Sequence, residues 1–249
     1  MKAMILAAGL GTRLRPLTND RPKALVEVAG RTLLEITLAR LREFGVREVI
    51  VNVHHFADMV EHYLRAKSNF GMGIEISRED DLLLGTGGGL KKAGWFFEQK
   101  PGSEEPFLLH NVDVISNVDL RRMIGFHHAR QALATLAVQD RETSRYLLFN
   151  ELLELCGRKS GWGGKPEMVR QAIDSRPLAF SGIHIISPRF TSMMTERGAF
   201  SIVDSYLRLA AQGDKIVAFR ADEYYWRDLG KPEQVAKAAA DIASGKLLS

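Results

Sequence analysis

The segment Leu6 to Leu25, LAAGLGTRLRPLTNDRPKAL, carries the first residues of the chain that are suited to chemistry. Gly9 and Gly11 let the backbone approach a ligand closely, and successive backbone N–H groups in such a turn converge on an anion. Arg13 can fork onto phosphate oxygens, and Lys23, ten residues later, adds a point charge at a second place. The types and spacing of these residues indicate a phosphate site.

Two common phosphate motifs do not fit this segment. A Rossmann dinucleotide site has a third glycine where this chain has Leu14, and an acidic residue near the end of the second strand, which here reads VNVHHF. A P-loop requires Gly-Lys-Ser/Thr, which is absent. A turn that only connects two elements remains an alternative, but Arg13 and Lys23 just beyond it argue against that reading.

The hydrophobic pattern predicts the elements that must position these residues. Up to about residue 140, short apolar runs such as 2–7 and 48–53 alternate with helical patterns such as 31–45, which is typical of a parallel sheet covered by helices. Later runs predict a hairpin with its turn at Asn150-Glu151 and a helix over 231–245. We therefore expect an α/β fold, with a Rossmann-like, mixed and mainly parallel sheet flanked by helices and a small β-rich lid.

Composition narrows the class of protein. The chain has 249 residues, 45% of them hydrophobic and 26% charged, with a formal charge of +4 and no block of like charges, so we expect no nucleic-acid partner. Cys156 is the only cysteine, which excludes an intrachain disulfide and predicts a buried core residue. The N-terminus reads as a first strand rather than a signal peptide, and no apolar run reaches the roughly 18 residues of a membrane span. We expect a cytoplasmic protein without a membrane partner.

Five motifs, in the same order as in a known family, give a more specific prediction. The N-terminal segment resembles the signature of the sugar-phosphate nucleotidylyltransferases, and the resemblance continues through GTGGGL, HNVDV, FSGIHII and WRDLGKPEQ. It implies the nucleotide-diphospho-sugar transferase fold over a single domain, 1–249. Residues 1–140 would bind the nucleotide, and 141–249 would supply the sugar-binding half and the C-terminal helix.

The resemblance also implies a reaction and the residues that perform it. A nucleoside triphosphate and a sugar 1-phosphate would be joined with release of pyrophosphate, by a monomer or small homo-oligomer. Arg13 and Lys23 would be catalytic, Arg13 on the leaving pyrophosphate and Lys23 where the sugar phosphate attacks, and the cofactor Mg²⁺ would be held by Asp113 and Asp228. Nucleotide contacts are expected at Ala8, Gly9, Gly11, Thr12, Arg13, Gly85, Thr86, Gly87 and Gly88, and sugar contacts at Asn111, Ser181 and Gly182.

Three features bear on the substrate. Gly85 to Gly88 would form an open loop against the nucleobase, so that enlarging Gly87 would block the base without unfolding the protein. Val112 stands where many members have glycine and is expected to narrow the space beside Asp113, and the family's Glu-Lys-Pro sugar-contact motif has only a partial echo at 163–168. The resemblance favours UTP with N-acetylmuramate 1-phosphate.

Other substrates and other classes of protein stay open. GTP with mannose or heptose 1-phosphate is the first alternative, and cytidylyl transfer to choline phosphate has similar motifs. A nucleotide-sugar-binding regulatory protein without catalysis is an alternative of another class, and a Rossmann dehydrogenase is a third. No hexapeptide repeat follows WRDLG, so we expect no appended acyltransferase.

Overall fold

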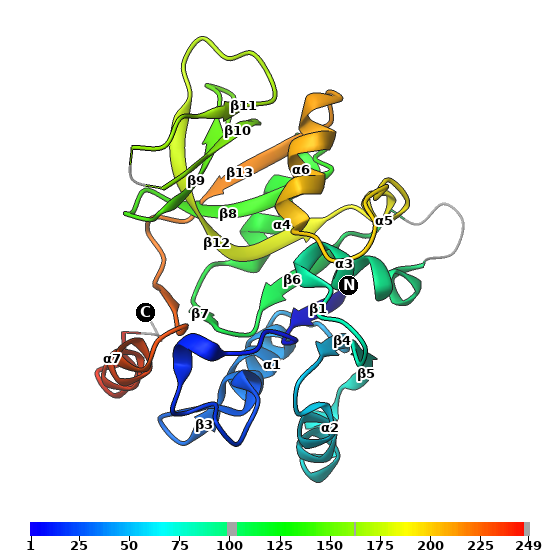
Figure 1. Cartoon of the computed structure of the whole chain (residues 1–249), viewed down its shortest axis with the longest axis vertical. Helices are drawn as coiled ribbons and strands as arrows, with labels where there is room; N and C mark the ends of the chain where they lie inside the picture. The colour runs from blue at the N-terminus through cyan, green and yellow to red at the C-terminus, as the bar shows by residue number, and fades with distance from the viewer. Residues whose placement is uncertain (99–103, 162, 247–249) are drawn as a thin grey trace.

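A computed structural model describes residues 1–98, 104–161 and 163–246. Its centre is a ten-stranded mixed sheet with the order β11-β10-β9-β12-β6-β1-β4-β5, to which β8 and β13 are joined beside β12. The first half of the chain contributes parallel pairs around β1, and β12 then pairs antiparallel with β6, β8 and β9. Figure 1 shows β1, β4 and β5 in blue to cyan below, and strands β8 to β13 above them.

The strands of the main sheet are β1 (Lys2–Leu6), β4 (Glu48–Val53), β5 (Gly73–Arg78), β6 (Phe107–Asn111), β8 (Ala134–Gln139), β9 (Arg145–Phe149), β10 (Leu155–Ser160), β11 (Glu167–Met168), β12 (Arg176–Ile186) and β13 (Ile216–Arg220). Two small antiparallel pairs lie outside it: β2 (Glu27–Val28) with β3 (Arg31–Thr32), and β7 (Val114–Ser116) with β14 (Trp226–Asp228). The predicted hairpin is confirmed, since β9 and β10 are joined by a turn that begins at Asn150.

The helices are α1 (Leu33–Glu43), α2 (Ala57–Ala66), α3 (Gly85–Lys92), α4 (Leu120–Arg130), α5 (Arg189–Ser192), α6 (Ile202–Ala211) and α7 (Pro232–Ala243). Short 3₁₀ turns are η1 (Thr12–Leu14), η2 (Lys23–Leu25), η3 (Ser68–Gly71) and η4 (Gly94–Phe97). Among the described residues, no helix combines the length and the apolar character that a membrane crossing needs.

Two hydrophobic cores lie on opposite faces of the sheet, because neighbouring strand residues point to opposite sides. Ile5 belongs to one core, with residues of α1, α2, α4 and α7, and Met4 to the other, with residues of α3, α5 and α6. Burial on both faces explains the continuous apolar runs of the first strands. The α/β class with a mixed sheet flanked by helices is thereby confirmed.

One local prediction was wrong. Gly85 to Gly88 were expected to form an open loop, but they are the first turn of α3. The strand β14 begins at Trp226 and pairs with all three residues of β7.

Candidate active site

The predicted phosphate loop leaves β1 at the carboxyl edge of the parallel strands. Ala7 and Ala8 are buried, and Gly11 has φ 66°, a left-handed conformation that a glycine adopts without strain. The Thr18 hydroxyl donates to the Gly11 carbonyl at 2.9 Å and holds the loop closed. A pocket of about 220 Å³ lies against this loop, lined by Gly9, Leu10, Gly11, Thr12, Arg13, Lys23, Leu83 and Gly230.

A second, larger cavity of about 840 Å³ adjoins this pocket, and Arg13 lines both. Its walls come from both halves of the chain. They include six residues that the sequence analysis selected, namely Arg13, Thr86, Asn111, Ser181, Gly182 and Asp228. The arrangement provides two neighbouring cavities that share Arg13 as a lining residue, which suits two substrates that must meet.

Asp113 and Asp228, which are 115 positions apart in the sequence, come together in space. Asp228 lies on β14 opposite Val114 of β7, and the Leu229 N–H donates to the Asp113 carbonyl at 2.8 Å. The Gly230 N–H donates to Asp228 Oδ1 at 2.6 Å and fixes that carboxylate. A Cβ added at Gly230 would lie 2.9 Å from Arg13 Nη2, so the guanidinium passes directly over this turn.

Lys23 places a positive charge beside Asp113. It begins the 3₁₀ turn η2 after Pro22, and its ammonium donates to Asp113 Oδ2 in a part-buried ion pair. Lys23 was expected to be a phosphate ligand and Asp113 a metal ligand. The structure joins the two side chains directly.

The three predicted sugar contacts also meet at one place. Gly182 has φ 73°, and a Cβ there would lie 2.7 Å from Asn111 Nδ2, so β12 passes tightly against the end of β6. The Ser181 carbonyl accepts from Trp226 Nε1 at 2.7 Å, and the Ser181 hydroxyl is buried without a partner among the described residues. Trp226 thus ties the sugar-side strand to the strand that carries Asp228.

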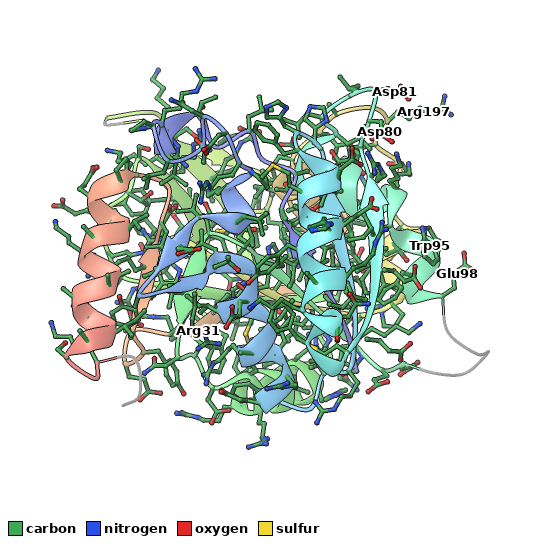
Figure 2. The ribbon with its side chains drawn as sticks, turned by 90° about the horizontal axis from the view of Figure 1, so that it is seen from below. Arg31, Asp80, Asp81, Trp95, Glu98 and Arg197 are labelled. Carbon is green, nitrogen blue, oxygen red and sulfur yellow. The ribbon has the colours of Figure 1, made fainter. Side chains whose placement is uncertain are left out.

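The glycines at the start of α3 are packing positions. A Cβ at Gly85 would lie 2.7 Å from the Phe200 carbonyl oxygen, one at Gly87 2.3 Å from the Phe200 ring, and one at Gly88 2.6 Å from the Gly198 oxygen. Because these glycines have no side chain, the segment before α6 can pack directly against the backbone of α3. Figure 2 shows Asp80 and Asp81, which precede α3, and Arg197, which precedes α6, at the same corner of the view. Gly87 and Gly88 are buried, so a larger residue at Gly87 would disturb the fold itself.

A buried polar chain that the sequence analysis missed connects the two predicted nucleotide-binding segments. Asn52 accepts from the Ala7 N–H at 2.8 Å and donates to Glu79 Oε1 at 2.6 Å, while Glu79 Oε2 accepts from the Leu84 N–H at 2.8 Å. Asn52 is 2% exposed and Glu79 1%. The asparagine inside the apolar run of β4 could have indicated this network, because buried polar side chains need hydrogen-bond partners.

A second missed network supports Asp228. Asp241 of α7 accepts from Arg227 and Tyr225, and Arg227 also donates to Gln234 at 2.7 Å. Hydrogen bonds from Lys246, Arg227 and Tyr225 lower the pKa of Asp241 to about 2. The C-terminal helix therefore clamps the strand that carries Asp228.

Other side chains near the site correct or complete the expectations. Val112 was expected to narrow the space beside Asp113. Its side chain is instead 2% exposed and packs into the core. Lys165, in the partial echo of the sugar motif, does not line the large cavity. Burial lowers the pKa of His110 to about 4 and that of His184 to about 3, so both are neutral at pH 7.

Comparison with known proteins agrees with this geometry. The protein-family model described as "Nucleotidyl transferase" matches residues 2–148. The chain is 38% identical to N-acetylmuramate alpha-1-phosphate uridylyltransferase of Caulobacter vibrioides, over 97% of this chain and 96% of that protein. It is 29% identical to mannose-1-phosphate guanylyltransferase of Mycobacterium tuberculosis, over 98% of this chain but 65% of the relative, so it spans less than two thirds of that protein.

Solved structures share the fold. HddC from Yersinia pseudotuberculosis complexed with GMP-PN matches with a TM-score of 0.76 at 22% identity, covering 97% of this chain and 99% of that one. UDP-glucose pyrophosphorylase complexed with UDP-glucose matches with a TM-score of 0.75 at 19% identity, covering 98% of each chain. With the family match over more than half of its length, the chain belongs to the nucleotidyl transferase family and is a sugar-phosphate nucleotidylyltransferase.

Proposed function

We propose that this protein transfers a uridylyl group from UTP to N-acetylmuramate 1-phosphate and releases pyrophosphate. The observation that carries the choice of substrates is the 38% identity to the Caulobacter uridylyltransferase, which extends over both halves of the chain. The mannose-1-phosphate guanylyltransferases among the relatives reach 29–32%.

The chemistry requires no protein nucleophile. A phosphate oxygen of the sugar 1-phosphate attacks the α-phosphorus in line, a new P–O bond forms, and the bond from the α-phosphorus to the bridging oxygen breaks. Pyrophosphate leaves with the electron pair. Two polyanions must be brought together, so catalysis rests on positioning and on neutralisation of charge.

Arg13 and Lys23 suit the two ends of this displacement. Arg13 lines both cavities and can fork onto the leaving β- and γ-phosphates. Lys23 lines the smaller pocket and donates to Asp113. We place the α-phosphate and the attacking phosphate beside this ion pair. As an ammonium it can follow the charge that concentrates there in the transition state.

Asp113 and Asp228 have the carboxylate oxygens that Mg²⁺ prefers, and they would hold the ion. Among the described residues no group of three or more acidic, His or Cys side chains is placed to hold a metal ion, so this ion would take its remaining ligands from phosphate oxygens and water, as Mg²⁺ commonly does. When bound, it would neutralise the phosphates and polarise the reacting phosphorus. Asp113 and Asp228 are held next to each other by the β7–β14 pairing, which suits them for a shared ion.

We assign the nucleotide to residues 1–140 and the sugar to 141–249. The phosphate loop from Ala8 to Arg13 would hold the triphosphate, with the base near Thr86 and the backbone of Gly85 to Gly88. Thr86 lines the large cavity, and its hydroxyl accepts from the Ile202 N–H at 2.9 Å. Asn111, Ser181 and Gly182 would contact the sugar.

A matrix of four nucleoside triphosphates against a panel of sugar 1-phosphates, read by pyrophosphate release with Mg²⁺, tests the proposal. UTP with N-acetylmuramate 1-phosphate should give the highest kcat/KM. A maximum for GTP with mannose or heptose 1-phosphate would favour the guanylyl alternative. Binding of a nucleotide sugar without turnover of any pair would identify a regulatory protein instead.

A further inference from the structure

Arg141 occupies the large cavity but belongs to none of the family motifs. It follows β8, and its guanidinium carbon lies 3.7 Å from the centre of the Trp226 ring. Nη2 donates to the Phe180 carbonyl at 2.9 Å. The stem and head of this side chain are therefore fixed between the sugar-side strand β12 and the strand that carries Asp228.

The charge of Arg141 lacks a carboxylate ion-pair partner in the part of the chain that the structure describes. Its Nε is buried without a hydrogen bond there, and burial lowers the pKa of the guanidinium. Two other arginines that line the cavity differ in this respect: Arg158 pairs with Glu167 and Asp204, and Arg227 pairs with Asp241. A desolvated cation without a paired anion is unfavourable unless a ligand supplies the anion.

The position of Arg141 identifies which anion this is. Trp226 and Asp228 are two residues apart on one strand, so they share a face about 7 Å apart along it. Asp228 attracts the Arg141 charge, and in the proposed function that carboxylate would hold Mg²⁺. A phosphate that reaches the ion from the sugar side would come within range of the guanidinium.

Resting on the proposed function, we propose that Arg141 binds the phosphate of the acceptor sugar 1-phosphate and positions it in the acceptor site. A guanidinium suits this ligand because its fork matches two phosphate oxygens, and Trp226 holds it flat against the cavity wall. The family's sugar-contact motif is incomplete in this chain, and its partial echo at Lys165 lies outside the cavity.

Steady-state kinetics of Arg141→Met and Arg141→Lys test this assignment. Methionine keeps an apolar stem over Trp226 and removes the charge, so KM for the acceptor should rise about 10- to 100-fold, as expected for a lost charge-assisted hydrogen bond, while KM for UTP changes less than about twofold. Lysine should restore part of the loss. An unchanged KM for the acceptor in an active Arg141→Met enzyme would overturn the assignment, whereas a wild type without turnover would overturn the proposed function.

Calorimetry separates the phosphate from other parts of the acceptor without relying on turnover. Arg141→Met should weaken binding of both N-acetylmuramate 1-phosphate and N-acetylglucosamine 1-phosphate, because both carry the phosphate. A loss confined to N-acetylmuramate 1-phosphate would assign Arg141 to its carboxylate and refute the phosphate assignment. Arg122→Met is the matched control: Arg122 also lies over a ring, that of Tyr224 at 5.9 Å, but it is exposed and paired with Glu223.

Discussion

Replacing Gly87 by alanine should destabilise the protein relative to the same replacement at Gly125. Both glycines lie inside helices, so each substitution removes backbone freedom from the unfolded chain and gains up to about 1 kcal/mol. Gly125 faces open space, with no atom within 4 Å of an added Cβ. At Gly87 the new methyl group would lie 2.3 Å from the Phe200 ring and 3.0 Å from the Ile202 nitrogen.

Placing a methyl group in such a packed site costs about 1–3 kcal/mol. Gly125→Ala should therefore raise the free energy of unfolding by about 1 kcal/mol. The free energy of unfolding of Gly87→Ala should be lower than that of Gly125→Ala by about 1–3 kcal/mol. Urea unfolding of the two variants and the wild type, compared at equal m-values, measures this difference. Truncating Phe200 to alanine should recover most of it in a double-mutant cycle.

A Gly87→Ala protein as stable as Gly125→Ala would refute the packing argument and reopen the view of Gly87 as a free loop position. The prediction concerns stability and is independent of which base the protein accepts. It also replaces the earlier expectation that a β-branched residue at Gly87 would block the base in an otherwise undisturbed fold.

Three further predictions concern the charged residues of the site. Lys23→Ala should lower kcat by on the order of 10²–10³ with a modest loss of UTP affinity, and Lys23→Arg should rescue poorly; an intact kcat with weakened UTP binding would make Lys23 only a triphosphate ligand. Asp113→Asn and Asp228→Asn should each lose most activity and most Mg²⁺ affinity by calorimetry, and full activity in excess chelator would contradict the metal assignment. The pKa of Asp241 lies near 2, below its unfolded value, so its stabilising contribution should be present above about pH 4 and be lost as the pH falls through 2. The stability difference between wild type and Asp241→Asn should shrink over that range, and a constant difference would show that the charge is not what stabilises β14.

Local sequence was a good guide wherever the signal lay within one element. The apolar runs of β1 and β4 needed only neighbouring residues to be predicted as strands, and the structure confirms them. The glycines of α3 were wrongly predicted as a loop because that prediction also used only neighbouring residues. Their purpose is the approach of Phe200, more than 100 positions away, which leaves no trace in the spacing of GTGGG itself.

By itself, the sequence determined the α/β class and predicted a phosphate site in the first loop from its glycines and charged residues, because these inferences depend on periodicity and side-chain chemistry along the chain. Only the tertiary structure decided that Lys23 contacts Asp113, that Asn52 and Glu79 join the two nucleotide-side segments, and that Arg141 lies on Trp226. Each of these contacts joins residues 27 to 90 positions apart. Such pairs arise from how the strands are ordered in the sheet, and that order is set by the packing of the whole chain rather than by any local pattern.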